Sequence, residues 1–174
     1  MSTAPEQSGS GRSPAIEVFW AQCKARHGAL AGVERYDVWR FGDSDELCDA
    51  LLELVLSGRK TATAGLLWDF AEGGEPMPAV GGYSIDTDSS GLPTCLLQTV
   101  EVVVRPYAEV PSDFAFDEGE DDRTLESWRR NHWAYFTRRC RALGREPDLS
   151  MPVVCERFRL VARRDDPPVA PVGD

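Results

Sequence analysis

The sequence lacks several features that would place it in a familiar class. It has only two histidines, His27 and His132, which excludes a three-histidine metal centre. No stretch approaches the roughly 18 apolar residues that a membrane-spanning helix needs. The first residues, MSTAPEQSGSGRS, contain no apolar core of the kind that a secretory signal requires. We therefore expect a cytoplasmic protein with no membrane partner.

Cysteines are few and widely spaced, and the usual cofactor motifs are missing. The cysteines stand at positions 23, 48, 95, 140 and 155, without a CxxC pair or the cysteine and histidine spacing of structural zinc. We expect them to be small core residues and predict no metal site. There is no P-loop, no GxGxxG, no GxSxG elbow and no HExxH. The sequence therefore predicts no cofactor.

The charge of the chain is unevenly distributed. Its 174 residues carry a net charge of -10, yet residues 127–164 hold 10 basic and 3 acidic side chains, and all 10 are arginine. Extended duplex binding needs a surplus of basic residues over the whole footprint, so duplex DNA is not an expected partner. A nucleotide-sized ligand at the boundary of the two regions is compatible with this distribution. The simplest explanation of the arginines is a solvated helix face that answers the acidic segment before it.

The length fits one folded domain with polar ends. Residues 1–12 and 165–174 have the composition of disordered tails, which leaves residues 13–164 as the domain. Three helices are expected, each between a capping residue and a glycine. They run from Ser13 to Gly28, from Asp43 or Ser44 to Gly58, and from Thr124 to Gly144.

The remaining segments predict strands. Residues 58–70 leave the second helix as a strand, residues 80–87 and 92–105 form a hairpin around a turn at 88–91, and residues 151–162 form a closing strand. Two helices followed by several strands, with one helix inserted before the last, predict an α+β fold rather than regular βαβ alternation. We expect the strands to close into a small, partly open β-barrel with flanking helices.

One acidic residue of the closing strand lies on an apolar face. A period of two places Val154, Glu156, Phe158, Leu160 and Ala162 on one side. Because an isolated buried charge costs several kcal/mol, Glu156 must be paired, hydrogen-bonded or protonated. It is either a structural partner or one wall of a site.

Two segments can carry chemistry. The first, GRKTAT at 58–63, offers Lys60 beside two threonine hydroxyls, although regular strand geometry places Lys60 and Thr63 on opposite faces. The second, at 117–122, concentrates five carboxylates, whose mutual repulsion raises some pKa values unless cations lie nearby. The plain alternative is a solvated loop that caps the third helix. His132, alone on that helix, is expected to be a surface or core-edge residue.

A lysine, a threonine and a carboxylate in one cleft can perform acyl transfer. A neutral Lys60 would take the hydroxyl proton while Thr63 attacks a carbonyl and Glu118 orients the groups or relays protons. Alternatively, Lys60 stays charged and stabilises a developing oxyanion. The sequence leaves both roles open.

The combination of these segments resembles the ASCH domain family, and within it a group of bacterial stand-alone proteins. The resemblance covers residues 38–162 and is carried by 38–70, 77–85, 114–136 and 151–161. It implies a PUA-like β-barrel whose ligand is RNA or a modified nucleoside. Related small proteins are amidohydrolases that remove acyl groups from the exocyclic nitrogen of cytidines.

The resemblance also implies site residues. Lys60, Thr63 and Glu118 correspond to the catalytic lysine, threonine and glutamate. We expect the substrate to be bound by residues around them, namely Arg59, Thr61, Trp68, Tyr83, Trp128 and Glu156. A non-catalytic RNA-binding module, with Trp68 or Trp128 stacking on a base, is one alternative. A ribonuclease with a divalent ion on Glu118, Glu120 and Asp122 is the other.

Overall fold

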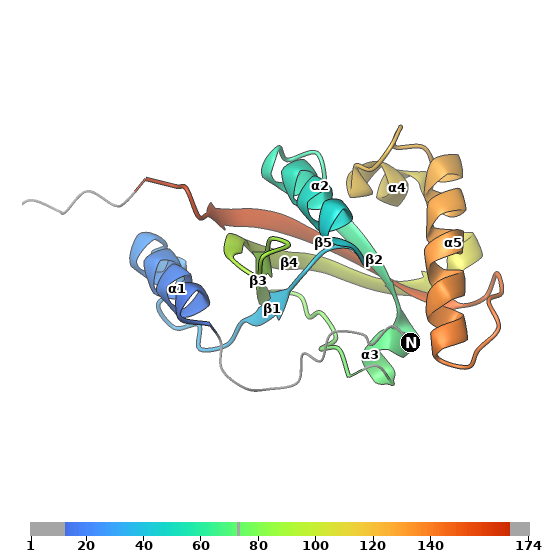
Figure 1. Cartoon of the computed structure of the whole chain (residues 1–174), viewed down its shortest axis with the longest axis horizontal. Coiled ribbons are helices and arrows are strands. Elements are labelled where there is room, and N and C mark those ends of the chain that lie inside the picture. Colours follow the sequence, from blue (N-terminus) through green and yellow to red (C-terminus); the bar gives the residue numbers. More distant parts are fainter. Residues whose placement is uncertain (1–12, 73, 168–174) are drawn as a thin grey trace, which may run out of the picture.

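The computed structural model describes residues 13–72 and 74–167 (Figure 1). A single five-stranded mixed sheet, in the order β1-β3-β4-β5-β2, curls into a half-barrel with helices around it. The predicted α+β class is therefore confirmed. The predicted tail at 1–12 lies outside the described residues, as do positions 168–174 of the predicted tail at 165–174.

The two longest strands form the centre of the sheet. β4 (Pro93–Pro106) and β5 (Pro152–Arg163) pair antiparallel along most of their length. β3 (Tyr83–Thr87) pairs antiparallel with β4 as the predicted hairpin, and β1 (Asp37–Trp39) adds to β3 in parallel. At the other edge, β2 (Ala62–Leu66) pairs antiparallel with β5. This edge strand follows directly from the GRKTAT segment.

The three predicted helices are present with the expected caps. They are α1 (Pro14–Arg26), α2 (Asp45–Leu56) and α5 (Leu125–Ala142). At each N-terminus the side-chain oxygen of the capping residue accepts the backbone N–H three residues on; the capping residues are Ser13, Ser44 and Thr124. α2 ends at Gly58 in the left-handed conformation that favours glycine, with φ of 76°.

The sequence prediction missed three short elements. β1 has three residues, α3 (Leu67–Ala71) has five and α4 (Ser112–Glu118) has seven. Elements of this length hold too few residues for a hydrophobic period to emerge. Residues 67–71 are helical rather than a continuation of the strand predicted over 58–70. The chain also forms single 3-10 turns at Gly28–Leu30 and Tyr107–Glu109.

The core consists of three clusters around the sheet. α1 packs with Ile85 and Leu96, while α2 packs on the opposite face with Cys95 and Leu97, the residues that flank Leu96 in β4. The third cluster joins β2 and the start of β5 to α4 and α5. All five cysteines are free and buried, as expected.

The apolar face predicted for the last strand holds only in part. Phe158 lies in the core cluster that includes α2, whereas Ala162 lies in the cluster that includes α1. The reason is a register shift between Leu96 and Leu97 of β4, which pair with Ala162 and Leu160. The single step from Leu96 to Leu97 in β4 therefore pairs with two steps in β5, from Ala162 to Leu160. The β5 side chains beyond this bulge point to the opposite face of the sheet.

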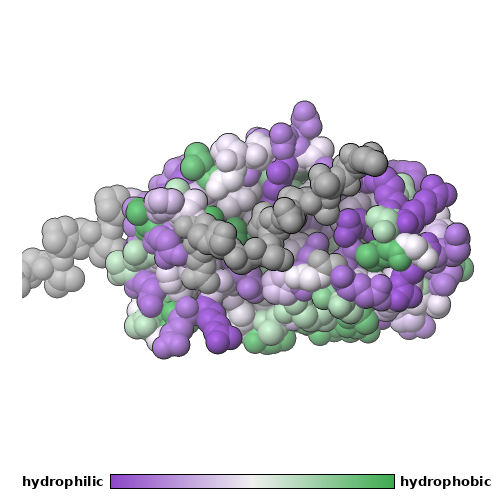
Figure 2. All heavy atoms as spheres, turned by 60° about the horizontal axis from the view of Figure 1, so that its bottom comes forward, coloured by the Kyte–Doolittle hydropathy of each residue, from purple (hydrophilic) through white to green (hydrophobic). Residues whose placement is uncertain are grey.

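The face drawn in Figure 2 is largely hydrophilic, with hydrophobic side chains gathered along its lower edge. None of the helices in the described residues is long and apolar enough to cross a membrane.

Candidate functional site

The site forms where the end of α4 contacts the segment between α2 and β2. The Thr61 N–H donates to the Asp117 carbonyl at 2.8 Å, and the Arg59 side chain donates to the Gly119 carbonyl at 2.7 Å. Gly119 has φ of 75°, and a Cβ atom there would lie 2.3 Å from the Arg59 carbonyl oxygen. Only glycine permits this approach, which brings Glu118 to Lys60.

Lys60 lies at the centre of this contact and is almost completely buried, with 1% of its side chain exposed. Its ammonium donates to Glu118 Oε2 at 3.0 Å and to Glu120 Oε1 at 2.7 Å. Burial opposes the charge, but the two carboxylates outweigh burial and raise the pKa of Lys60. Lys60 is therefore a charged group, held between two acids.

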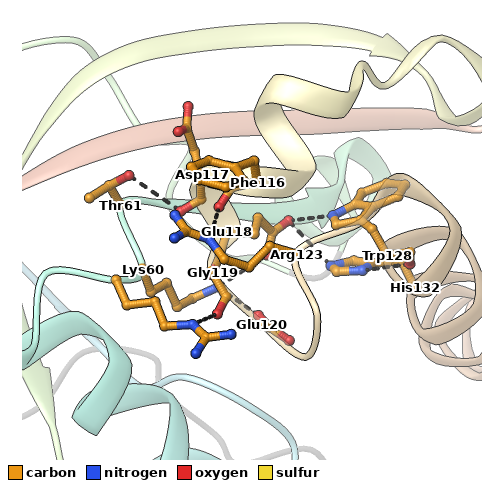
Figure 3. Close-up of polar contacts among 11 residues, drawn as sticks. Lys60, Thr61, Phe116, Asp117, Glu118, Gly119, Glu120, Arg123, Trp128 and His132 are labelled. Carbon is orange, nitrogen blue, oxygen red and sulfur yellow. Dashed lines mark hydrogen bonds and ion pairs between the residues drawn. The ribbon is translucent and has the colours of Figure 1, made fainter.

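The two oxygens of the Glu118 carboxylate face different elements (Figure 3). Oε2 faces Lys60, whereas Oε1 accepts the indole N–H of Trp128 at 2.8 Å and lies 3.3 Å from Nε2 of His132. Burial alone would raise the pKa of Glu118, but Lys60 and His132 hold it well below its usual range. Glu118 is thus an ionised carboxylate in a nearly water-free site.

The rest of the acidic segment is also partnered. Asp117 accepts from Arg157 at 2.8 Å, and the Asp121 carboxylate accepts from Asn131. Asp122 accepts hydrogen bonds from Ser127 and Thr124 at the start of α5, which lower its pKa to about 2. The segment therefore does cap α5, as the plain alternative held, while Glu118 and Glu120 turn inward to a cation.

Thr63 lies apart from this network. Among the described residues, its hydroxyl forms no hydrogen bond with Lys60 or Glu118. Its neighbour across the sheet is Glu156, and directly opposed residues of an antiparallel pair point to the same face. Glu156 accepts the Thr99 hydroxyl at 2.6 Å, and burial raises its pKa. Thr63 and Glu156 thus face the same side of the sheet at opposed positions of β2 and β5.

The other expected binding residues have varied surroundings. Arg59 is tied to the backbone of Gly119 and Asp121, and the exposed Thr61 hydroxyl donates to the Asp117 carbonyl. Tyr83 accepts from Gln98 on the sheet. These contacts hold Arg59 and Thr61 beside Lys60, whereas Tyr83 belongs to a different part of the sheet.

The two expected stacking residues are covered. Trp128 is buried, so it offers no face to a base. Trp68 lies in α3, where the Arg145 guanidinium stacks over its ring at 4.4 Å. Trp133 of α5 is the more exposed indole, at 36%.

The sequence prediction assigned no role to His132, yet it lies beside Glu118. Its ring stacks on Trp128 with centroids 4.2 Å apart, and both residues occupy one face of α5 at a spacing of four. A histidine four residues after a tryptophan, on the face that turns to Glu118, was the available signal.

The arginines of residues 127–164 mostly pair with carboxylates outside the acidic segment at 117–122. Arg138 pairs with Asp43 and Arg139 with Asp69, while Arg157 contacts three carboxylates, of which only Asp117 lies in that segment. These contacts tie α5 and β5 to earlier parts of the chain. The expected helix face that answers the segment before it is present only in part, through Arg130 of α5, which lies 3.9 Å from Asp121.

Two hollows adjoin α4 and α5. An open groove of about 570 Å³ lies on the outer side of α4, lined by Ser112, Asp113, Phe116, Asp117, Arg123, Thr124 and Leu125. A small enclosed cavity of about 10 Å³ lies beside Glu120 and His132. Within the described residues, no group of three or more acidic, histidine or cysteine side chains is arranged to hold a metal.

A curled half-barrel with helices at its rim and a polar site between its edge strand and two helices is a PUA-like domain. The chain belongs to the ASCH domain family, which matches residues 37–162. The family predicted from the sequence is therefore confirmed. Members of this family are generally RNA-binding.

Two solved structures are similar to this chain. The ASCH domain from Lactobacillus crispatus JV V101 shares 29% identity with a TM-score of 0.81, over 87% of this chain and 96% of that one. Protein EF3133 from Enterococcus faecalis V583 shares 32% identity with a TM-score of 0.74, over 85% and 90%. No curated protein shows significant similarity to the chain.

Proposed function

We propose that this ASCH protein binds a cytidine-like nucleoside, free or within RNA, and hydrolyses an N-acyl amide on its base. The observation that carries the proposal is the buried Lys60 ammonium between Glu118 and Glu120, directly before Thr61 and three residues before Thr63 in the chain. Lys60, Thr63 and Glu118 have the identity and spacing of the amidohydrolases that the sequence resembles. A fixed cation in a site with little water can stabilise a developing oxyanion.

The state of Lys60 favours one of its two possible roles. Both carboxylates hold its proton, so it suits charge stabilisation better than proton abstraction. Glu156 is better suited to be the base, because it lies across from Thr63 and its pKa is raised. Thr63 is then the nucleophile, Glu156 its base and Lys60 the oxyanion partner.

The proposed reaction has two steps. The Thr63 oxygen attacks the amide carbonyl carbon and its proton passes to Glu156; the carbon–nitrogen bond then breaks and Glu156 returns the proton to the leaving amine. Water next hydrolyses the threonine ester, which releases the carboxylic acid and restores the hydroxyl. The sum is one amide and one water giving one amine and one acid.

Glu120 has to give way during this reaction. Its Oε1 atom lies 2.7 Å from the Lys60 ammonium, but 28% of its side chain is exposed, against 1% of the Glu118 side chain. A substrate oxygen can replace Glu120 at the ammonium while Glu118 keeps its place. Glu120 thus acts as a displaceable counter-ion.

The test is hydrolysis of N4-acetylcytidine, as nucleoside and within a single-stranded RNA. We expect wild type to release acetate, and Thr63→Val and Glu156→Gln to lose turnover. Thr94→Val, at the start of β4, is the matched control, because it makes the same replacement of a hydroxyl by a methyl group elsewhere in the chain. Turnover by Thr63→Val equal to wild type would remove Thr63 from the mechanism.

A non-catalytic RNA-binding module is the second candidate, favoured by the outer face of α5. Arg129, Trp133 and Arg141 are exposed, and intervals of four and eight residues place them along one side of the helix. No carboxylate of the described residues forms an ion pair with Arg129 or Arg141. This candidate predicts RNA affinity that falls with salt, and less steeply when both arginines are replaced by glutamine.

A further inference from the structure

His132 makes two polar contacts from a largely covered position on α5, with 11% of its side chain exposed. Its Nδ1 atom lies 3.0 Å from the Trp128 carbonyl oxygen, and its Nε2 atom lies 3.3 Å from Glu118 Oε1. The ring is held between Trp128, on which it stacks, and Phe136, which meets it edge-on at 5.5 Å. Its orientation is therefore fixed by packing as well as by polar contacts.

These two contacts determine how many protons the ring carries. A carbonyl oxygen only accepts, so Nδ1 must bear a hydrogen. If Nε2 bore none, its lone pair would face the lone pairs of an ionised carboxylate in a site with little water. One further proton must therefore lie between His132 and Glu118.

A count of charges leads to the same result. Glu118 and Glu120 contribute two negative charges, and Lys60 contributes one positive charge. Because Glu118 is buried and Glu120 is partly buried, an excess of one negative charge is unfavourable there. An imidazolium at His132 makes the row Glu120, Lys60, Glu118, His132 alternate in sign and sum to zero.

We propose that His132 is a charged positioning residue that keeps Glu118 ionised and turned toward Lys60. Together with Trp128 it engages Oε1, which leaves Oε2 for the ammonium. The catalytic consequence rests on the proposed function, because Lys60 can hold an oxyanion only while Glu118 holds Lys60. The protonation state does not depend on that function.

The surroundings of His132 come from several elements. Burial disfavours its charge, and Glu118 and Glu120 outweigh burial, with Lys60 acting against them, so that its pKa is raised. The small cavity beside it also contains Asp121, whose carboxylate is bonded to Asn131. The cavity, at about 10 Å³, is about the size of one water molecule.

The direct test is nitrogen NMR of the imidazole in the full chain. His27→Asn removes the only other histidine, so the remaining signals belong to His132. At pH 7.5, about one unit above the ordinary histidine pKa, we expect both ring nitrogens to carry a proton. A neutral ring with one N–H at that pH would overturn the proposal, whether or not the protein hydrolyses any substrate.

Two variants separate charge from hydrogen bonding. His132→Gln retains a donor without the charge, and His132→Phe retains the stacking without a donor. Removing a positive charge within hydrogen-bond reach should raise the pKa of Glu118 by about one to three units in both. Carbon NMR of the Glu118 carboxyl measures this shift directly. A Glu118 pKa that stays unchanged in both variants would reduce His132 to packing.

The outcomes distinguish this proposal from the proposed function. A protonated His132 in a protein that hydrolyses no acylated cytidine would support the role of His132 and reject the proposed function. A neutral His132 in an active enzyme would support the proposed function and reject the role of His132. The Glu118 carboxyl signal, followed by carbon NMR in His132→Gln, gives the shift without any assay.

Discussion

The Lys60 ammonium and the Glu118 carboxylate lie 3.0 Å apart, and each side chain is 1% exposed. Removing two charges from water costs several kcal/mol per ion, so such a pair stabilises a fold only when further contacts satisfy both groups. Here those contacts come from Glu120, Trp128 and His132. The pair thus depends on side chains from three segments of the chain.

Replacement of Lys60 by methionine should be strongly destabilising. Glu118 would stay buried with its cation removed, and leaving one partner of a buried pair alone costs about 3–5 kcal/mol. We expect that loss in the free energy of unfolding from urea titration. Lys24→Met removes the other lysine, a half-buried residue near the end of α1. This change should cost less than about 1 kcal/mol. Equal losses in the two variants would contradict a buried pair.

Two glycines with similar backbone angles should respond differently to alanine. Gly58 and Gly119 have φ of 76° and 75°, but a Cβ at Gly58 meets nothing within 4 Å, whereas one at Gly119 meets the Arg59 carbonyl. Gly58→Ala should cost only the left-handed conformation, about 1–2 kcal/mol. Gly119→Ala should cost more, because α4 must move away from Lys60. Thermal unfolding of both variants makes the comparison, and similar losses would argue against the close approach.

How much the sequence predicted depended on the length of each element. α2 and α5 have long apolar stripes between caps and glycines, and both were predicted. α4 has seven residues and is mostly acidic and aromatic, so no helix was predicted there. Its absence from the prediction hid the way in which Glu118 reaches the interior.

The same limit applies to the site. Lys60 and Glu118 were found through the identity of their motifs, but nothing in the sequence says which oxygen faces which partner. His132 was missed because its role arises from the packing of α5 against α4, which are joined by only six residues in a tight turn. A histidine on a helix is unremarkable until the neighbouring helix is placed.

The indole N–H of Trp128 should contribute measurably to stability. It donates to Glu118 Oε1 at 2.8 Å, and a hydrogen bond to a charged group contributes about 1.5–3 kcal/mol. Trp128→Phe keeps an aromatic ring for His132 and Tyr107 to pack on but loses this donor. We expect a loss in that range plus some cost of the smaller ring.

Trp133→Phe provides the control for ring size alone. Trp133 packs on the same Tyr107, yet it is 36% exposed. Chemical unfolding should show a clearly smaller loss for Trp133→Phe. If the two variants lose equal amounts, the bond from Trp128 to Glu118 adds little to the fold.

Asp86 should make the protein less stable as pH rises. It is fully buried in β3, accepts the Ser84 hydroxyl at 3.1 Å, and its Oδ1 has no partner among the described residues. Burial raises its pKa to about 7, and Glu156 adds to the effect. Its contribution is therefore fully present below the unfolded pKa of 3.8 and is lost as pH rises through about 7.

Asp86→Asn tests this because asparagine accepts the same hydrogen bond and does not ionise. A shift from 3.8 to about 7 corresponds to about 4 kcal/mol, so the variant should gain up to that much relative to wild type between pH 4 and pH 8. Lys60, Glu118 and His132 titrate in both proteins, and their effects cancel in the difference. The measurement is urea unfolding of both proteins at several pH values across that window. A difference that stays constant with pH would show that Asp86 is ionised in the folded protein at an ordinary pKa, and that the β3 interior is more polar than its burial indicates.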